Sequence, residues 1–279
     1  MKSESKTKTY SEFRAVLESS DLPEVIRENL KHILEERLKK IPRESSFSML
    51  DVGSSDGEMS LPLAQWLNGS FSNFRYTAIE PEKPALKKLN ERIQTQGIDY
   101  AETSNLTIEQ YLETKKQEEG QFDFILFSHV FYHTPKEEWG EVIRDSQRLL
   151  KPDGFIIVVL ASFEGQACKL LDLVTENKTR VDTLEFGNLY YAEDMEGFLQ
   201  KKGTKYYVDK FPVHFFVSEG EQKLLNFAQL LGFLYRTFPE KILANYRDEL
   251  QEFLERIKKG DKYILEINKA ITFGKDSQS

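Results

Sequence analysis

The strongest constraint on this chain is an apolar run that breaks into an acidic turn containing glycine. Met49–Val52 is followed by glycines at positions 53 and 57, and a second apolar run ends in a carboxylate at Glu80. Glycines allow the backbone to approach a ligand closely, and a carboxylate at the end of the second strand can bind ribose hydroxyls. The pattern therefore predicts a βαβ unit that holds a ribose-bearing cofactor.

The residues of this turn indicate which cofactor it holds. A dinucleotide fingerprint reads Gly-x-Gly-x-x-Gly and places a pyrophosphate at a helix N-terminus. Here Asp51, Gly53 and Gly57 form the pattern Asp-x-Gly-x-x-x-Gly. The carboxylates of Asp51 and Asp56 would repel a pyrophosphate but suit a ligand with an ammonium and a sulfonium group. The pattern resembles motif I of the class I S-adenosylmethionine-dependent methyltransferases, with Ser55 at the middle glycine. The resemblance implies S-adenosylmethionine as cofactor and S-adenosylhomocysteine as product.

From position 47 onward, strand and helix patterns alternate, which predicts βαβ crossovers and a parallel sheet. Pro62 is compatible with its helix only if it lies in the first turn. We expect an α/β, Rossmann-like class I methyltransferase fold with a mostly parallel seven-stranded sheet. The predicted strands of its first half are 47–52, 74–80, 98–103, 122–128 and 154–160. The predicted helices there are 59–68, 83–95, 106–115 and 137–150.

Both ends of the chain are predicted to cover this core. Residues 10–41 read as two helices, the second capped by Asp21 with Pro23 in its first turn. The C-terminal half is expected to contain helices at 163–175 and 192–201, strands at 205–217 and 263–273, and helical periodicity at 224–235 and 242–257. This helical insertion could either roof an acceptor pocket or add to the core. We expect one integrated domain made of covering helices (1–45), a cofactor-binding core (46–160) and a C-terminal half (161–279).

Composition narrows the class of partner. The formal charge of −8 weighs against binding to a phosphate backbone, and no window has the ~18 consecutive apolar residues of a membrane span. The N-terminus lacks the apolar stretch of a secretory signal. A single cysteine, Cys168, excludes a disulfide framework and a cysteine-based zinc site. We expect a cytoplasmic monomer that acts on a small molecule, without nucleic acid, membrane or metal.

The predicted strand at 122–128 delivers a polar and aromatic cluster just beyond its end. His129, Tyr132 and His133 would lie near the transferring methyl group. An unperturbed imidazole titrates near pH ~6.5, so His129 could act as a base on the acceptor. It could equally only hydrogen-bond the acceptor. His133 is interpreted as a pocket wall or a surface residue.

Within the methyltransferases, the layout resembles the histamine N-methyltransferase family. The shared features are the N-terminal helices, the Glu80-Pro81 pair, the segment 122–125 and Gly165. The resemblance implies that Gly53, Glu80, Thr107 and Ser128 contact S-adenosylmethionine. It also implies that His129 replaces an acceptor-binding glutamine and that Asn268 stands near a C-terminal asparagine of the family.

The chain departs from this family at the acceptor site. The family's N-terminal glutamate has no clear match, and Gln166 and Leu170 or Leu171 replace its tryptophans. We therefore expect an acceptor other than histamine. The predicted reaction is methyl transfer to a nitrogen or oxygen of a small molecule; a protein or peptide methyltransferase and an inactive binding module are the alternatives. The predicted cofactor residues are Asp51, Gly53, Ser54, Ser55, Gly57, Glu80, Thr107 and Ser128. The predicted acceptor residues are His129 (also the catalytic candidate), Tyr132, His133 and Asn268.

Overall fold

The computed structural model describes residues 20–39, 41–98, 100–166, 190–216, 224–229, 239–260 and 262–275. Three sequence predictions lie outside these residues. They are the first N-terminal helix, the setting of Cys168 and most of the helix predicted at 163–175, including the two leucines that replace a family tryptophan.

The strands follow the predicted order closely. They are β1 (Ser46–Val52), β2 (Asn73–Ile79), β3 (Ala101–Ser104), β4 (Phe122–Ser128), β5 (Leu150–Ala161), β6 (Tyr206–Phe216), β7 (Lys258–Lys259) and β8 (Lys262–Gly274). The helices are α2 (Leu22–Leu38), α3 (Ser60–Ser70), α4 (Lys83–Gln96), α5 (Ile108–Thr114), the 3-10 turn η1 (Lys136–Glu138), α6 (Trp139–Leu149), α8 (Ala192–Lys202) and α10 (Pro239–Ile257). Residues 224–229 are also helical. Helical segments thus lie between β6 and β8, as predicted.

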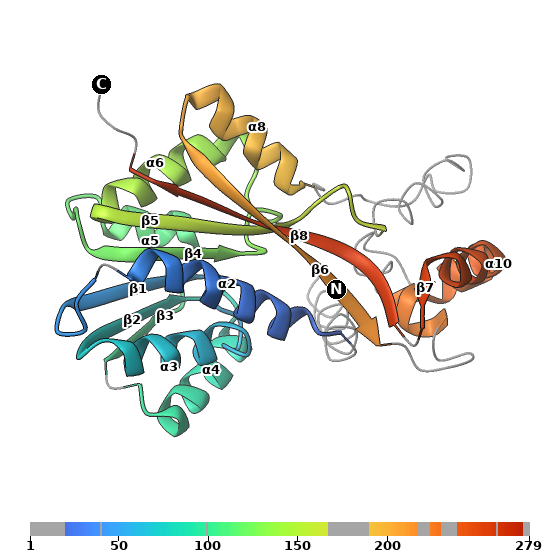
Figure 1. The fold of residues 1–279 in the computed structure, drawn as a ribbon, viewed down its shortest axis with the longest axis horizontal. Coiled ribbons are helices and arrows are strands. Elements are labelled where there is room, and N and C mark those ends of the chain that lie inside the picture. Colours follow the sequence, from blue (N-terminus) through green and yellow to red (C-terminus); the bar gives the residue numbers. More distant parts are fainter. Residues whose placement is uncertain are drawn as a thin grey trace. The chain divides into compact units, whose positions relative to one another are not determined.

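The strands form one sheet in the order β3-β2-β1-β4-β5-β8-β6, with the short β7 paired to β8. β1 pairs in parallel with both β2 and β4, and the outer pairs β2–β3 and β4–β5 are parallel too. β8 runs opposite to β5 (Figure 1). The chain therefore reverses its strand order beside β1, and ligands of open α/β sheets bind at such a switch point. The predicted mostly parallel seven-stranded sheet is confirmed.

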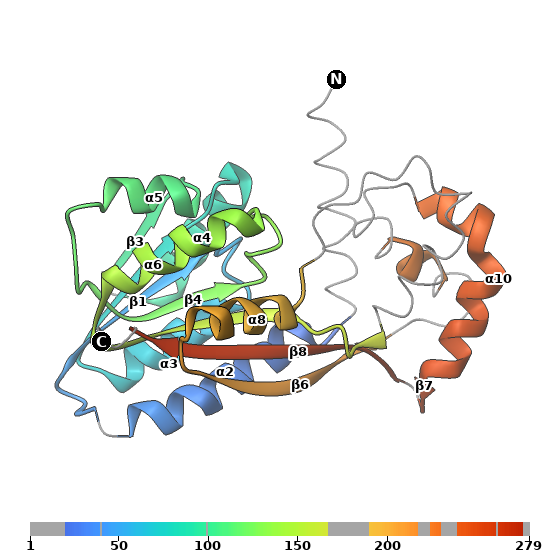
Figure 2. The same ribbon diagram turned by 90° about the horizontal axis from the view of Figure 1, so that it is seen from above.

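The central strands are buried along most of their length because both faces of the sheet are covered. In Figure 2, α2 and α3 lie on one face and α5 and α6 on the other. Six of the seven residues of β1 are buried, and Phe155–Leu160 of β5 is buried throughout. Strands that are buried on both faces are typical of a parallel sheet between two helix layers. Pro62 lies in the first turn of α3, as its missing N–H demands.

By contact density the chain divides into two compact units. One comprises 1–25, 161–191 and 211–268; the other comprises 26–160, 192–210 and 269–279. The second unit contains β1 to β5 and most of the residues considered below. Integration of the chain into one domain stays a prediction.

One local prediction was wrong. Asp21 was expected to cap the helix that became α2, but its carboxylate accepts hydrogen bonds from the backbone N–H of His214 at 2.7 Å and bonds to the Nδ1 of the same residue at 2.9 Å. The hydroxyl of Ser20 accepts from the N–H of Leu22 at 3.4 Å instead. A carboxylate with a charge-assisted partner distant in sequence gains more there than at a neighbouring N–H group. Only the tertiary structure supplies that partner.

Candidate functional site

The turn after β1 has a backbone that ordinary side chains would not allow. Gly53 and Gly57 have φ angles of 66° and 77°, and Ser55 between them has a φ of 50°. A Cβ on Gly53 would lie 2.8 Å from the side chain of Val130, and one on Gly57 would lie 2.5 Å from that of Leu89. Gly53 therefore permits the strand ends to approach each other, and Gly57 permits α4 to pack on the turn. The sequence predicted glycines here for close approach to a ligand, whereas the contacts that exclude a side chain at these two positions come from the protein's own Val130 and Leu89.

The carboxylate of Glu80, at the end of β2, holds this turn in place. Its Oε2 accepts from the backbone N–H of Ser55 at 2.8 Å, and its Oε1 accepts from that of Glu82 at 2.8 Å. Glu80 is 6% exposed, and burial raises the pKa of its carboxyl while the two N–H groups oppose that rise. Each oxygen keeps a further lone pair. A buried carboxylate fixed in this way can accept hydrogen bonds from ligand hydroxyls without first reorganising.

Asn105 supports the same position and was not singled out from the sequence. Its Nδ2 donates to the carbonyl oxygens of Glu80 at 2.9 Å and Pro81 at 2.8 Å. It follows directly after β3, where polar residues gather at the carboxyl ends of the strands. That position was the one available signal, because nothing in the sequence pairs Asn105 with the end of β2.

Asp51 is buried within the sheet. Its carboxylate accepts from the hydroxyl of Tyr76 at 2.7 Å, and that hydroxyl lies 3.3 Å from the hydroxyl of Ser60. Burial raises the pKa of Asp51 to about 6, and the charge of Glu80 adds to the rise. The carboxyl is therefore mostly ionised at pH 7 but desolvated, so a neighbouring cation would stabilise its charged form. Its predicted role toward the cationic end of the cofactor stays a prediction.

Asp56 is placed differently from what the charge argument assumed. Its Oδ2 lies 3.4 Å from the Nη2 atom of Arg92 on α4, and its side chain is 5% exposed. The guanidinium offsets much of the negative charge that the sequence assigned to the turn. Of the two carboxylates, Asp51 is the one that forms no ion pair with a described residue. The repulsion of a pyrophosphate is accordingly weaker than the sequence alone indicated.

Ser128 and His129 emerge where β4 ends. The hydroxyl of Ser128 lies 3.3 Å from the sulfur of Met59, which precedes α3. His129 has a φ of 58°, a left-handed conformation that histidine tolerates better than most residues, and its N–H donates to the carbonyl of Val159 at 2.9 Å. The end of β4 therefore lies beside the segment that leads from the turn after β1 into α3.

An aromatic cluster fixes the loop after β4. Phe131 is fully buried and its ring lies 5.0 Å from that of Phe127 and 5.4 Å from that of Trp139. The indole N–H of Trp139 donates to the carbonyl of Thr134 at 3.0 Å. The loop therefore has a defined conformation between two anchored ends. That conformation sets the positions of His129 and the residues that follow it.

The ring of His129 contacts Tyr132 through one nitrogen and leaves the other without a bond. Nδ1 lies 3.2 Å from the Tyr132 hydroxyl, and the ring centroids are 5.7 Å apart. Nε2 is buried and has no hydrogen-bond partner among the described residues. Burial, together with the nearby charge of His133, lowers the pKa of His129 to about 4. The imidazole is therefore neutral at pH 7, with a buried polar atom that a ligand could satisfy.

Thr107, Asn268 and His133 are the remaining predicted residues. Thr107 is the N-cap of α5, where its hydroxyl accepts from the N–H of Gln110 at 3.3 Å in a capping box. Asn268 belongs to the other compact unit, and both polar atoms of its side-chain amide are buried without a hydrogen-bond partner among the described residues. His133 is exposed. Contact of these three residues with cofactor or acceptor stays a prediction.

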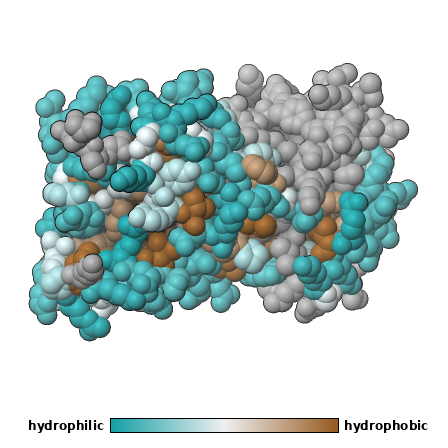
Figure 3. Space-filling model, turned by 45° about the horizontal axis from the view of Figure 1, so that its top comes forward, coloured by the Kyte–Doolittle hydropathy of each residue, from teal (hydrophilic) through white to brown (hydrophobic). Residues whose placement is uncertain are grey.

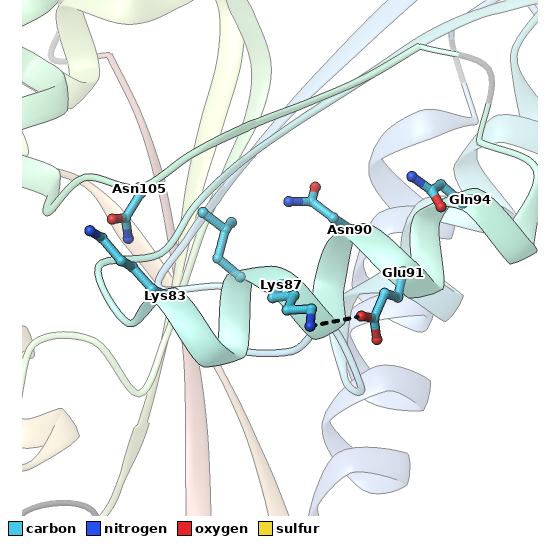
Figure 4. A pocket seen from close by; sticks show the side chains of 7 residues that line it. Lys83, Lys87, Asn90, Glu91, Gln94 and Asn105 are labelled. Carbon is cyan, nitrogen blue, oxygen red and sulfur yellow. Dashed lines mark ion pairs between the residues drawn. The ribbon is translucent and has the colours of Figure 1, made fainter.

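A separate groove of about 520 Å³ follows α4. Figure 4 shows that its side chains come from that helix and from the residue after β3, and that Lys87 and Glu91 form an ion pair at 3.9 Å. It is lined by Leu86 and by the stems of long polar side chains, and none of the lining residues is buried as a group that positions a reacting atom would be. The described surface in Figure 3 is likewise mainly hydrophilic, with scattered hydrophobic side chains. The groove is not a candidate reaction site.

Within the described ranges, no helix is both long and apolar enough to cross a membrane. In the same residues, no three His, Cys, Asp or Glu side chains gather as a metal site would require.

Comparison with known proteins agrees with this geometry. A family model described as a methyltransferase domain matches residues 20–207. No curated protein matches the sequence. Three solved structures share the fold. The YcgJ protein of Bacillus subtilis is 13% identical, with a TM-score of 0.54, 88% of this chain covered and 100% of that one. A candidate methyltransferase from Bacillus halodurans is 16% identical, with a TM-score of 0.55 and coverages of 88% and 99%. A candidate sarcosine dimethylglycine methyltransferase from Galdieria sulphuraria is 17% identical, with a TM-score of 0.52 and coverages of 90% and 86%.

Proposed function

The chain belongs to the methyltransferase-domain family and is an S-adenosylmethionine-dependent methyltransferase, and we propose that it methylates a nitrogen or oxygen of a small molecule. The observation that carries this proposal is the buried Glu80 carboxylate, held by the N–H of Ser55 beside a glycine turn at the switch point of the sheet. A hydrogen-bond-accepting carboxylate fixed at this place suits the two hydroxyls of a ribose.

Bound S-adenosylmethionine would supply an electrophilic methyl carbon. A lone pair of the methyl acceptor bonds to that carbon as the carbon–sulfur bond breaks, and S-adenosylhomocysteine is the leaving group. The protein has to hold the two reactants in line at about 3–3.5 Å, so orientation supplies most of the rate enhancement. Glu80 would hold the ribose, and the backbone at Gly53 and Ser54 would pass close to the ligand because Gly53 has no side chain. Asp51 would favour the cationic amino-acid end. Ser55 and Gly57 shape the turn, and Thr107 and Ser128 complete the proposed cofactor contacts.

The acceptor would bind on the side of His129. Its Nε2 is buried without a hydrogen-bond partner among the described residues, so a ligand could bond to it. Tyr132 and His133 would form the wall beside it. Asn268 is proposed to contribute from the C-terminal half. The resemblance to histamine N-methyltransferases is part of this proposal, but the residues that would hold an imidazole amine differ. We therefore propose a small, partly apolar acceptor other than histamine.

Calorimetric titration with S-adenosylhomocysteine tests the cofactor half of this proposal. We expect micromolar binding, no binding of NAD, and weaker binding by Glu80→Ala. Glu113→Ala is the matched control, because the Glu113 side chain is 65% exposed and its carboxylate pairs with Lys116, an exposed lysine just beyond the end of α5. A preference for NAD, or equal affinity of Glu80→Ala and the parent protein, would overturn the assignment of the site.

The acceptor half requires a transfer assay with methyl-labelled S-adenosylmethionine. Small-molecule and protein fractions of one lysate are offered separately, and Glu80→Ala measures the background. We expect label to enter the small-molecule fraction. Label in protein alone would favour a protein methyltransferase, and cofactor binding without any transfer would favour an inactive binding module.

A further inference from the structure

The sequence leaves two roles open for His129, as a base or as a hydrogen-bonding group, and the contacts of its two ring nitrogens separate them. Nδ1 faces the hydroxyl of Tyr132 at 3.2 Å, whereas Nε2 is buried without a partner among the described residues. A neutral imidazole carries one proton and so has one donor and one acceptor nitrogen. The Tyr132 contact therefore decides what Nε2 can offer to a ligand.

A phenol and a neutral imidazole interact best when the phenol donates. The phenol O–H, with an ordinary pKa of ~10, is a stronger acid than the N–H of a neutral imidazole. The unprotonated ring nitrogen is in turn a better base than the phenol oxygen. The Tyr132 O–H then donates to Nδ1, and the imidazole proton remains on Nε2. In that tautomer Nε2 has no lone pair in the ring plane and cannot accept a proton.

We propose that Tyr132 is a positioning residue that keeps the proton of His129 on Nε2, so that His129 donates a hydrogen bond to the methyl acceptor and does not act as its base. This inference rests on the proposed function and deepens it. The acceptor must then present a hydrogen-bond-accepting atom to His129, such as a carboxylate, a carbonyl oxygen or a ring nitrogen. Its nucleophilic lone pair must also be available without proton transfer to this residue.

The surroundings of His129 agree with a neutral donor. The ring is desolvated, and the titratable side chains known to face it are Tyr132 and His133, neither of which is an anion at pH 7. Among the described residues, no carboxylate bonds to the ring to stabilise an imidazolium, the cation that a histidine base must become. The left-handed backbone of His129 and the hydrogen bond from its N–H to the carbonyl of Val159 fix the backbone from which the ring projects. The ring therefore has a fixed direction in which to donate.

The test measures the tautomer directly, by ¹⁵N NMR of the full chain labelled in its histidine rings, without cofactor or acceptor. The chain has four histidines, so the ring signals are few enough to resolve. His129→Asn identifies the signals of His129 by their loss, and asparagine tolerates the left-handed conformation. We expect a protonated, pyrrole-type Nε2 and an unprotonated, pyridine-type Nδ1 from pH 7 down to about pH 5.

Tyr132→Phe removes the hydroxyl but keeps the ring. We expect the two nitrogen shifts to move toward each other, as an exchanging mixture of tautomers requires. Tyr100→Phe is the control, because Tyr100 is 63% exposed and lies on another loop, and it should leave the spectrum unchanged. A proton on Nδ1 in the parent protein, a cationic ring at pH 7, or an unchanged tautomer in Tyr132→Phe would each overturn the proposal.

Titration of the same samples with S-adenosylhomocysteine separates this inference from the proposed function. Loss of the expected tautomer with normal nucleoside binding contradicts only the role of Tyr132. The expected tautomer without nucleoside binding supports that role and contradicts the proposed cofactor site.

Discussion

The Oε2 atom of Glu80 accepts a hydrogen bond of 2.8 Å from the backbone N–H of Ser55, so the acidic end of β2 holds the turn that follows β1. The same carboxylate binds the N–H of Glu82 through its other oxygen. One side chain therefore joins two loops at the edge of the sheet where cofactors bind. Its effects on stability and on ligand binding should be linked.

Glu80→Gln should weaken both. An amide keeps one oxygen but directs an NH₂ group at one of two backbone donors, and a charged acceptor is worth roughly 1.5–3 kcal/mol per bond. We expect affinity for S-adenosylhomocysteine to fall by about 10- to 100-fold, measured by calorimetry, and the urea midpoint to fall as well. If affinity falls while the unfolding midpoint is unchanged, Glu80 contacts the ligand but does not hold the turn.

Gly53→Ala should be destabilising for two separable reasons. A left-handed φ costs an alanine about 1–2 kcal/mol, and the new Cβ would lie 2.8 Å from a methyl carbon of Val130. The double variant Gly53→Ala with Val130→Ala removes the clash but keeps the backbone strain. We therefore expect the double variant to bind S-adenosylhomocysteine better than Gly53→Ala alone, though less tightly than the parent protein.

Gly69→Ala is the matched control for that series. Gly69 lies in α3 without a positive φ, and a Cβ added there would have no atom within 4 Å. Alanine should be neutral or stabilise the protein by up to about 1 kcal/mol, as measured by urea unfolding. A loss comparable to that of Gly53→Ala would mean that glycine replacement in general, and not the geometry at Gly53, is harmful.

Asp51 should make stability depend on pH. Its folded pKa is about 6, above the ordinary value of 3.8 for an aspartic acid, so between these values the native state binds the proton more tightly than the unfolded state. The stability contribution is therefore greatest below pH 3.8 and is lost as pH rises through 6. Over that range the loss amounts to at most about 3 kcal/mol.

Asp51→Asn removes this titration while keeping an oxygen for the Tyr76 hydroxyl. Measured by urea unfolding from pH 4.5 to 7.5, the stability of Asp51→Asn relative to the parent protein should increase with pH. A constant difference across that range would show that Asp51 titrates normally in the folded protein.

Lys269 should stabilise the packing of α8 on β8. Its side chain is 4% exposed, and its ammonium nitrogen lies 2.8 Å from a carboxylate oxygen of Glu193 and 2.8 Å from one of Glu196. Lys269→Met leaves two partly buried carboxylates without their cation, which should cost about 3–5 kcal/mol in urea unfolding. The control is Lys258→Met on the exposed β7. Equal losses in both variants would contradict a specific role for the buried ammonium.

Much of this fold was predictable because it depends on local patterns. Apolar runs marked β1, β2 and β4 within a residue or two of their ends. β3 and β5 deviated more. β3 begins at Ala101 rather than at 98, and β5 begins at Leu150 rather than near 154, through an irregular pairing of Phe122 with Leu150. That extension depends on the neighbouring strand, which a local pattern does not contain.

The sequence by itself determined the order of strands and helices, the glycine turn and the acidic residue after β2. Each of these follows from hydrophobic periodicity or from the backbone freedom of glycine, which are properties of neighbouring residues. The tertiary structure alone decided what the side chains of the site do. It pairs Asp56 with Arg92, buries Asp51 against Tyr76 and gives Nε2 of His129 no partner among the residues that the structure describes. Charge, pKa and hydrogen-bonding capacity depend on which distant residues approach and on how much water remains, so no local pattern in the chain specifies them.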